Sequence, residues 1–201
     1  MKKLLKNFIL FLLLIVWVGC GLFETRTPEE PNTKPSSFAP PTEPEIVVSN
    51  FANAFIEKNL SNYIACLSDT ALTDLENFEF IPASAALSQY PSLFNGWDIN
   101  AERQYFNSFA IKLQDAEKPK LTFSNMQYDK RPDSVVFVAE YLIDIQQSET
   151  TNFSSYAGTL QLTITQRSNG TWSIRRWRDA PAHEGSSPKE TWSILKAIYY
   201  N

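Results

Sequence analysis

From about residue 120 to residue 180, apolar residues recur at every second position, and this period limits the fold more than any other feature. Side chains alternate between the two faces of a β-strand, so each run predicts a strand with one buried face. Leu160, Leu162 and Ile164 share one such face. Asn169-Gly170, a strong hairpin signal, separates the last two runs. The runs are KLTFSNMQYD, DSVVFVAEYLIDIQQ, YAGTLQLTITQR and TWSIRRWRD, which together predict a half-buried antiparallel sheet.

Helical spacing governs the chain before these runs. Apolar residues recur at intervals of three and four in three stretches, which predicts three helices. The first stretch begins near residue 42, and the other two cover 62–67 and 101–113. The segment 71–97 has no clean period and predicts loops with short pieces of structure. Helices followed by antiparallel strands indicate an α+β fold. The residues expected to face the core are Val47, Phe51, Ala54 and Phe55 in the first helix, Tyr63, Ile64 and Leu67 in the second, and Tyr105, Phe106, Phe109, Ala110 and Leu113 in the third.

Capping signals predict where the helices begin. Thr42 followed by Glu45 is a capping box, with Pro44 tolerated in the first turn, and Ser61 is the expected cap of the second helix. Near the C-terminus, the pattern predicts a short helix that bears Trp192, Leu195 and Tyr199. Its expected start is Ser187 as cap, Pro188 as first helical residue and Glu190 completing a second capping box.

Residues 1–19 have the pattern of a secretory signal. Three lysines precede an uncharged apolar run over 8–18, which is shorter than the roughly 20 residues that span a bilayer. Gly19-Cys20-Gly21 then resembles the cleavage site of a bacterial lipoprotein, in which the cysteine is lipidated and becomes the first mature residue. We therefore expect palmitate or related acyl chains on Cys20 and a cell-envelope location, in the outer membrane facing the periplasm. A secreted protein and an uncleaved signal anchor are the alternatives.

Composition sets the domain boundaries and excludes some partners. Residues 21–45 contain six of the twelve prolines, so 20–45 is expected to be the lipidated cysteine with a disordered tether, and 46–201 a single domain. Removal of the signal takes three of the 18 basic residues and none of the 22 acidic ones, which leaves a net charge of −7. Such a chain lacks the basic footprint of a nucleic-acid-binding protein. Cys66 is then the only other cysteine, so no intramolecular disulfide is expected.

Two stretches, VVSNFANAFIEKNLSNYIACLSD and NGTWSIRRWRD, resemble the nuclear-transport-factor-2-like superfamily. Glu102, Arg103, Trp172, Trp177 and Asp179, with the closing TWSILKAIY, resemble a bacterial lipoprotein subgroup of it. The resemblance implies a cystatin-like roll, in which a cone-shaped curved antiparallel sheet packs against N-terminal helices around a concave pocket. Ketosteroid isomerase and scytalone dehydratase use buried Asp, His and Tyr in that pocket, whereas other members only bind. The fold alone therefore does not assign a function.

Two groups of charged strand residues have alternative interpretations. Glu140 and Asp144 alternate with the core stripe of the second strand run, so we expect them on the solvated face. The alternative is that both carboxylates lie in the cavity. The arginines at positions 175, 176 and 178 surround Trp177. They are expected to face solvent and pair with acids, and the alternative is an anion site with a stacking ring.

Other candidate residues have weaker signals. Asp179 is expected to cap a turn at the end of its strand, with a catalytic role as the alternative. The only histidine, His183, lies in a loop of small residues without a second ligand at metal-binding spacing, so no metal site is expected. Isolated glycines exclude a phosphate-cradling loop, and no cofactor is expected.

We expect a membrane-anchored, non-catalytic domain that binds a small apolar ligand or a protein partner. The alternative is an isomerase or dehydratase with a cavity carboxylate as base and a tyrosine as hydrogen-bond donor. A third hypothesis, suggested by the superfamily resemblance, is a scaffold that forms a homodimer through the open face of the sheet. The direction in which the acids and tyrosines point separates these hypotheses. An aromatic set could line a pocket, although most of its members are expected to be plain core: Tyr63, Phe80, Trp97, Tyr105, Tyr141 and Trp177.

Overall fold

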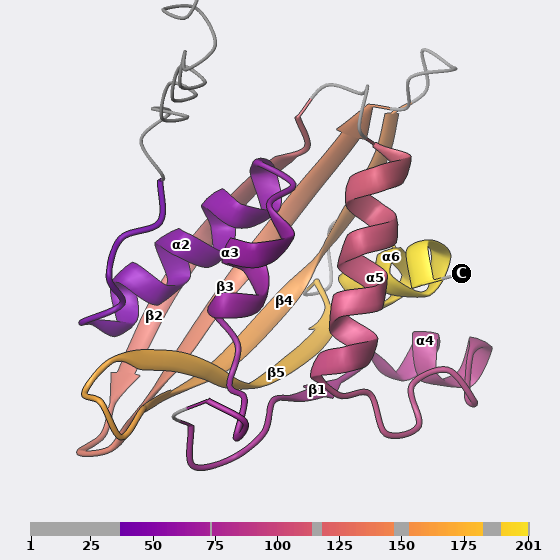
Figure 1. The fold of residues 1–201 in the computed structure, drawn as a ribbon. Helices are drawn as coiled ribbons and strands as arrows, with labels where there is room; N and C mark the ends of the chain where they lie inside the picture. The colour runs from indigo at the N-terminus through magenta and orange to yellow at the C-terminus, as the bar shows by residue number, and fades with distance from the viewer. Residues whose placement is uncertain (1–36, 73, 114–117, 147–152, 183–189, 201) are drawn as a thin grey trace, which may run out of the picture. The chain divides into compact units, whose positions relative to one another are not determined.

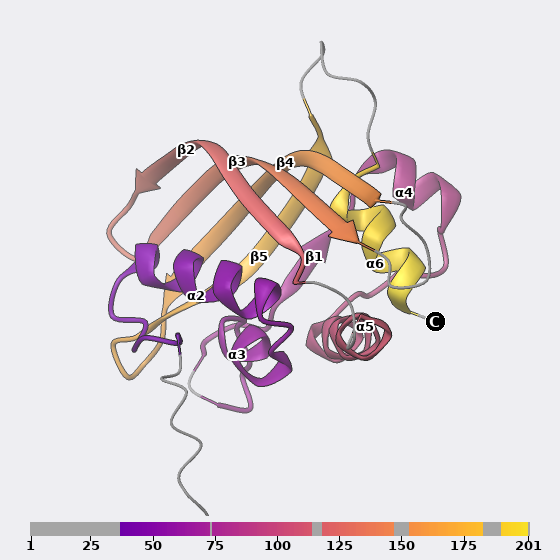
Figure 2. The ribbon, with the colours of Figure 1, turned by 90° about the horizontal axis from the view of Figure 1, so that it is seen from above.

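The computed structural model describes residues 37–72, 74–113, 118–146, 153–182 and 190–200. Its strands form one curved, unclosed sheet in the order β1-β5-β4-β3-β2 (Figures 1 and 2). The short β1 runs parallel to β5, and every other neighbouring pair is antiparallel. The four antiparallel strands and their hairpin order agree with the prediction from the alternating pattern. The parallel strand β1 lies in the segment 71–97, for which only loops with short pieces of structure were predicted. The strands are β1 Glu79–Ile81, β2 Lys120–Lys130, β3 Ser134–Gln146, β4 Phe153–Gln166 and β5 Trp172–Pro181.

Helices cover the concave face of this sheet. Figure 2 shows α2, α3, α5 and α6 on the inner side of the arch, with α4 beside α6. The longest of them, α5, packs against both α3 and α6. The resulting layer of helices on one side of a curved sheet is the predicted α+β architecture. The helices are α2 Pro44–Ile56, α3 Leu60–Ala65, α4 Ser84–Gln89, α5 Ile99–Lys112 and α6 Trp192–Tyr200.

The core lies between the sheet and the helices. In β3 every second side chain from Val135 to Ile145 is buried, and the residues between them are half-buried. Leu160, Leu162 and Ile164 of β4 are fully buried, as the sequence predicted. The predicted helical core residues are buried as well, except for the half-buried Ala110.

Two β-bulges interrupt the register of the sheet. On β5, Arg176 pairs with Thr163 and Ile174 pairs with Ile164, so Arg175 is the additional residue. A second bulge lies on β2 between Ser124 and Gln127, where the backbone enters the left-handed region at residue 125 with a φ of 52°. A bulge bends its strand and turns one side chain away from the regular alternation. Arg175 is therefore displaced from the pattern of its neighbours.

The predicted hairpin between β4 and β5 is present. The amide of Gly170 donates to the carbonyl of Arg167 at 3.0 Å, and Gly170 has a φ of +83°. A left-handed residue at this position closes the turn without a steric penalty only when it lacks a Cβ.

The predicted helix starts were less accurate. α2 begins at Pro44 with Glu43 rather than Thr42 at the cap, and α3 begins at Leu60 with Asn59 rather than Ser61. The Asn59 side chain accepts the amide of Asn62, whereas Glu43 makes no side-chain cap. Both shifts place the helix start where the flanking residue is already extended.

The C-terminal helix starts later than predicted. Glu190 forms a parallel bridge with Tyr156, and its carbonyl accepts the amide of Ala157 at 2.9 Å. Because residue 190 belongs to the sheet, α6 begins only at Trp192, and the predicted capping box is wrong. The other two residues of that prediction, Ser187 and Pro188, lie outside the described residues.

The packed chain extends before residue 46. The Asn50 side chain exchanges two hydrogen bonds with the backbone of Ala39, at 3.0 and 2.7 Å, and Trp172 donates its amide to Pro41 at 2.8 Å. Residues 39–41, expected in the tether, therefore lie against the domain. The expected signal peptide, Cys20 and the tether up to residue 36 lie outside the described residues. Within the described ranges, no helix is long and apolar enough to cross a membrane.

Candidate functional site

The six aromatic residues predicted as pocket lining converge in the interior of the domain. None is more than 4% exposed. Their rings pack directly on one another and on further core rings: Phe80 meets Trp177 edge-on at 5.2 Å, and Tyr63 stacks on Phe106 at 3.8 Å between centroids. These contacts fill the space between β5, α3 and α5 with side chains.

A buried ion pair lies among these rings. The ammonium of Lys196 on α6 is 2.5 Å from Oε2 of Glu102 on α5, and both side chains have no exposed surface. Tyr63 donates its hydroxyl to Oε1 of Glu102 at 2.7 Å, and Trp97 donates its indole N–H to Oε2 at 2.6 Å. The carboxylate thus accepts three donors, which is the arrangement that a buried charge requires.

Aromatic faces complete the environment of the ammonium. Lys196 Nζ lies 3.7 Å from the ring centre of Phe80 and 3.8 Å from that of Trp177, within the range of cation–π attraction. Burial lowers the pKa of Lys196 to about 8, against the opposing effect of Glu102. Burial and the nearby Glu102 charge raise the pKa of Tyr63 and of Tyr105 well above 10. Both phenols therefore remain protonated in the folded protein at neutral pH.

Sequence reasoning gave neither member of this pair a functional or structural role. Glu102 precedes Tyr105 and Phe106 by three and four residues, so it lies on the same helical stripe. Lys196 follows Trp192 by four residues and precedes Tyr199 by three. The helical spacing that identified the apolar core residues could have placed both charged residues in the core.

Asp179 is buried inside β5, so the prediction that it caps a turn is wrong. Tyr141 donates its hydroxyl to Oδ1 at 2.7 Å, and Ser193 donates its amide and its hydroxyl to Oδ2 at 2.7 and 2.5 Å. The Tyr141 oxygen in turn accepts the amide of Trp192 at 2.6 Å. Burial raises the pKa of Asp179, and these hydrogen bonds oppose the rise. The network ties the start of α6 to β3 and β5.

The acids of β3 point to the outer face, as predicted. Glu140 accepts the side-chain amide of Asn125 at 3.0 Å, and Asp144 accepts the hydroxyl of Ser155. Both are half-buried, opposite to the buried stripe that contains Tyr141. They do not form a pair of interior cavity carboxylates.

Two of the three arginines of β5 pair with acids, as predicted, and the third faces solvent. Arg175 pairs with Glu76, and Arg176 Nε donates to Glu79 at 2.7 Å. Arg178 is exposed, and Trp177 between them is fully buried. Trp177 therefore does not stack on an anion site with its neighbours.

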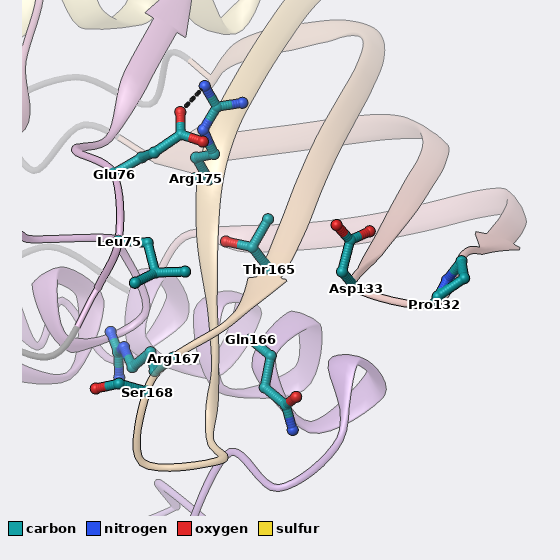
Figure 3. Close-up of a pocket in the computed structure, with 9 residues that line it drawn as sticks. All are labelled: Leu75, Glu76, Pro132, Asp133, Thr165, Gln166, Arg167, Ser168 and Arg175. Atoms are coloured by element: carbon teal, nitrogen blue, oxygen red, sulfur yellow. Dashed lines mark ion pairs between the residues drawn. The ribbon is translucent and has the colours of Figure 1, made fainter.

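A surface pocket of about 360 Å³ lies at the end of the sheet where the β2–β3 and β4–β5 turns meet the loop that follows α3 (Figure 3). Figure 3 shows Thr165 between Arg175 with Glu76 on one side and Asp133 with Pro132 on the other. None of the six predicted aromatic residues lines this pocket. Its lining residues are Leu75, Glu76, Pro132, Asp133, Thr165, Gln166, Arg167, Ser168 and Arg175.

Two predicted residues cannot be placed. His183, expected as an exposed loop histidine, and the lipidated Cys20 both lie outside the described residues. Cys66 is described and is a buried free thiol whose pKa is raised to about 12 by burial. Among the residues that the structure covers, no group of His, Cys, Asp and Glu side chains is arranged to hold a metal ion.

Comparison with known proteins finds similarity only at the level of structure. No protein-family model and no curated protein matches the sequence. A proposed scytalone dehydratase from Novosphingobium aromaticivorans DSM 12444 superposes with a TM-score of 0.55 at 10% identity, over 73% of this chain and 89% of that one. A nuclear transport factor 2 (NTF2-like) superfamily protein from Salmonella enterica serovar Typhimurium has a TM-score of 0.52 at 10% identity, over 70% and 90%.

A proposed dehydratase of the NTF2-like family from Streptomyces avermitilis gives a TM-score of 0.52 at 7% identity, over 69% of this chain and 93% of that one. The chain therefore has the nuclear-transport-factor-2-like fold, which confirms the fold expected from the sequence. Identities this low establish the fold and leave activity to be argued from the site.

Proposed function

We propose that this protein is a cell-envelope lipoprotein whose domain binds a ligand or a protein partner without catalysing a reaction. The anchor part of the proposal rests on the sequence of residues 1–21, a lysine-rich start and a short apolar run that ends at Gly19-Cys20-Gly21. Two or more acyl chains hold a protein stably on a membrane, at about 0.8 kcal/mol per buried methylene. The domain would then work at the membrane surface.

The observation that carries the non-catalytic part is the state of the interior carboxylates. Glu102 accepts hydrogen bonds from Tyr63, Trp97 and Lys196. Asp179 accepts one from Tyr141 and two from Ser193. A general base must be within hydrogen-bond reach of the substrate proton. Acids whose oxygens are already held by the fold in a packed core favour a structural role.

The alternative is an isomerase or dehydratase, and one observation favours it. Tyr63 with Glu102 and Tyr141 with Asp179 are buried phenol–carboxylate pairs, each at 2.7 Å. Two of the similar structures are proposed dehydratases, although likeness at such identity concerns the fold alone. An enzyme of this kind would have to open the packed core to admit a substrate, because Trp177 and Trp192 are fully buried beside these pairs.

A mass balance separates the two functions. Detergent-solubilised full-length protein is incubated with a small-molecule extract of the cell envelope, and every component is quantified by mass spectrometry before and after denaturation. A binding domain retains at most one equivalent of a component and releases it unchanged. Consumption of many equivalents with formation of a product, lost in Asp179→Asn but kept in Asp144→Asn, would contradict the proposal. Asp144 is the matched control because its carboxylate lies on the outer face of the sheet.

A further inference from the structure

We propose that the surface pocket of Figure 3 binds a small dipolar peptide of about two residues, with its carboxylate on Arg175 and its ammonium at Asp133. This inference rests on the proposed function, because it supplies a ligand class for a domain that binds without reacting. The pocket volume of about 360 Å³ is of the size that small-molecule sites have.

Arg175 provides the anion-binding end of the pocket. It is the additional residue of the β5 bulge, which fixes its backbone in the sheet and turns its side chain away from the regular alternation. Glu76 pairs with its Nη2, while its Nε is buried and has no hydrogen-bond partner within the described residues. A guanidinium presents two parallel donors to a carboxylate, so half of this fork is available. A buried donor without an acceptor is costly, and a ligand oxygen would satisfy it.

A ligand carboxylate can displace Glu76, the acid that pairs with Arg175. The Glu76 side chain is 57% exposed, whereas that of Arg175 is 25% exposed. An exposed ion pair contributes little stability, because water screens it and both long side chains lose freedom. A ligand carboxylate that reaches Nε as well as Nη2 would bind in bidentate geometry and replace Glu76.

Asp133 provides the opposite end. It lies in the turn before β3. Within the described part of the chain it has no ion pair, and its carboxylate accepts the hydroxyl of the neighbouring Ser134 at 3.1 Å. The two basic residues nearest in sequence pair with other acids, Lys130 with Glu45 and Arg131 with Asp129. The negative charge of Asp133 is therefore available for a ligand ammonium.

The spacing of the two ends sets the ligand length. Arg175 lies on β5 and Asp133 at the start of β3, with β4 between them, so two strand spacings put their backbones at least about 10 Å apart. The arginine side chain spans part of this distance. A single amino acid carries its two charges too close together, whereas an extended dipeptide reaches about 7 Å. Leu75, 81% exposed at the rim, offers apolar contact to a ligand side chain.

Calorimetric titration of the detergent-solubilised full-length protein with L-leucyl-L-leucine tests the inference. Saturable binding is expected, and it should weaken about tenfold or more with the N-acetyl or the C-terminal amide form, because each lacks one charge-assisted contact. Arg175→Gln should weaken the free dipeptide about tenfold but leave the amide unaffected. Asp133→Asn should weaken the free dipeptide about tenfold but leave the N-acetyl form unaffected. Glu76→Gln should tighten binding, since it removes the competing carboxylate.

Arg178→Gln and Asp129→Asn are the matched controls, because both residues are exposed and do not line the pocket. They should bind as the parent does, and thermal unfolding checks that every variant folds. Absence of saturable binding overturns the inference. Equal binding of the free and the blocked dipeptides also overturns it, because the pocket would then bind a peptide segment without using its terminal charges. If the dipeptide is recovered intact, the non-catalytic function is not contradicted, whether or not the dipeptide binds. If the dipeptide is hydrolysed, the non-catalytic function is contradicted.

Discussion

The ammonium of Lys196 lies 2.5 Å from a carboxylate oxygen of Glu102, and neither side chain has any contact with solvent. The two residues come from α5 and α6, far apart in the sequence, so the pair fixes the C-terminal helix against the central one. Such a pair requires that its remaining hydrogen-bonding capacity be satisfied, which Tyr63 and Trp97 do on the carboxylate side. The centre of the domain is thus a polar cluster enclosed by aromatic rings.

Removal of one charge from this pair is expected to destabilise the domain strongly. Lys196→Met leaves Glu102 buried without its counter-ion and should lower the free energy of unfolding by about 3–5 kcal/mol, measured by urea denaturation. The double variant with Glu102→Met should lose less than the sum of the single losses, since neither charge is then isolated. Arg176→Met, which removes an exposed pair, should cost below about 1 kcal/mol. Similar losses for Lys196→Met and Arg176→Met would contradict this account.

Alkaline pH should unfold the domain through its buried tyrosines. Burial raises the pKa of Tyr63, Tyr105 and Tyr141 above the ordinary value of 10. The unfolded chain therefore releases these protons first as the pH rises past 10, and the stability that is complete below pH 10 is lost above it. Tyrosinate absorbance and far-ultraviolet circular dichroism should change together for these residues. Ionisation of these tyrosines in a protein that keeps its native circular dichroism would contradict the prediction. Tyr105→Phe should reduce by one the number of protons released on unfolding.

Gly158 is expected to tolerate no side chain. A Cβ at this position would come closer than 3.0 Å to the backbone carbonyl of Ala180 and to the Tyr141 hydroxyl, so the neighbouring strand would have to move. Gly158→Ala should therefore cost about 1–3 kcal/mol by thermal or urea unfolding. Thr163→Ala, a substitution on the outer face of the same strand, should cost less. Equal effects of the two would argue against the close approach.

Asp74 should fix the loop that follows α3. Its side chain is 3% exposed and accepts two bonds from Arg167 Nε, at 2.9 and 3.1 Å, together with the amide of Asp69 and the hydroxyl of Ser173. Asp74→Ala should cost about 3 kcal/mol and speed hydrogen exchange at the Asp69 amide, because Arg167 is left nearly buried without its partner. Glu79→Ala, at an exposed pair, should leave that exchange rate unchanged. If the Asp69 amide exchanges as slowly in Asp74→Ala as in the parent protein, Asp74 does not fix this loop.

The proposed lipid anchor can be tested directly at Cys20. Cys20→Ser is expected to abolish palmitate labelling and to release the protein from the membrane fraction or leave it uncleaved, since acylation needs the thiol. Cys66→Ser is the matched control, because Cys66 is a buried thiol inside the domain. Labelling that persists in Cys20→Ser would contradict the lipoprotein part of the proposal.

The sheet could be predicted from the sequence because alternation with a period of two fixes which face is buried. Leu160, Leu162 and Ile164 form that face, and the register of β3 and β4 follows from the pairing of their buried sides. Helix starts were predicted less well, since Thr, Ser, Asn and Asp are all good caps and the choice depends on backbone direction. Asn59 and Asp98 cap their helices because the chain is extended there.

The polar interior and the surface pocket could not be predicted with equal ease. Charged residues are almost always expected to face solvent. The partners of Glu102 come from three separate segments: α3, the loop that precedes α5, and α6. The pocket depends on the bulge at Arg175 and on turns that are adjacent only in the folded sheet. The helical stripes mark Glu102 and Lys196 as interior positions, but their pairing and the lining of the pocket depend on contacts between distant segments.

The most direct test of the central claim, that the interior carboxylates hold the fold and do not catalyse, compares the parent protein with Glu102→Gln and Asp179→Asn. Unfolding free energy and consumption of envelope small molecules are measured on the same full-length preparations. Each variant should lose more than about 1 kcal/mol of stability, because buried donors lose a charged acceptor, and none of the three proteins should consume a substrate. A substrate consumed by the parent protein, and no longer by a variant of unchanged stability, would contradict it.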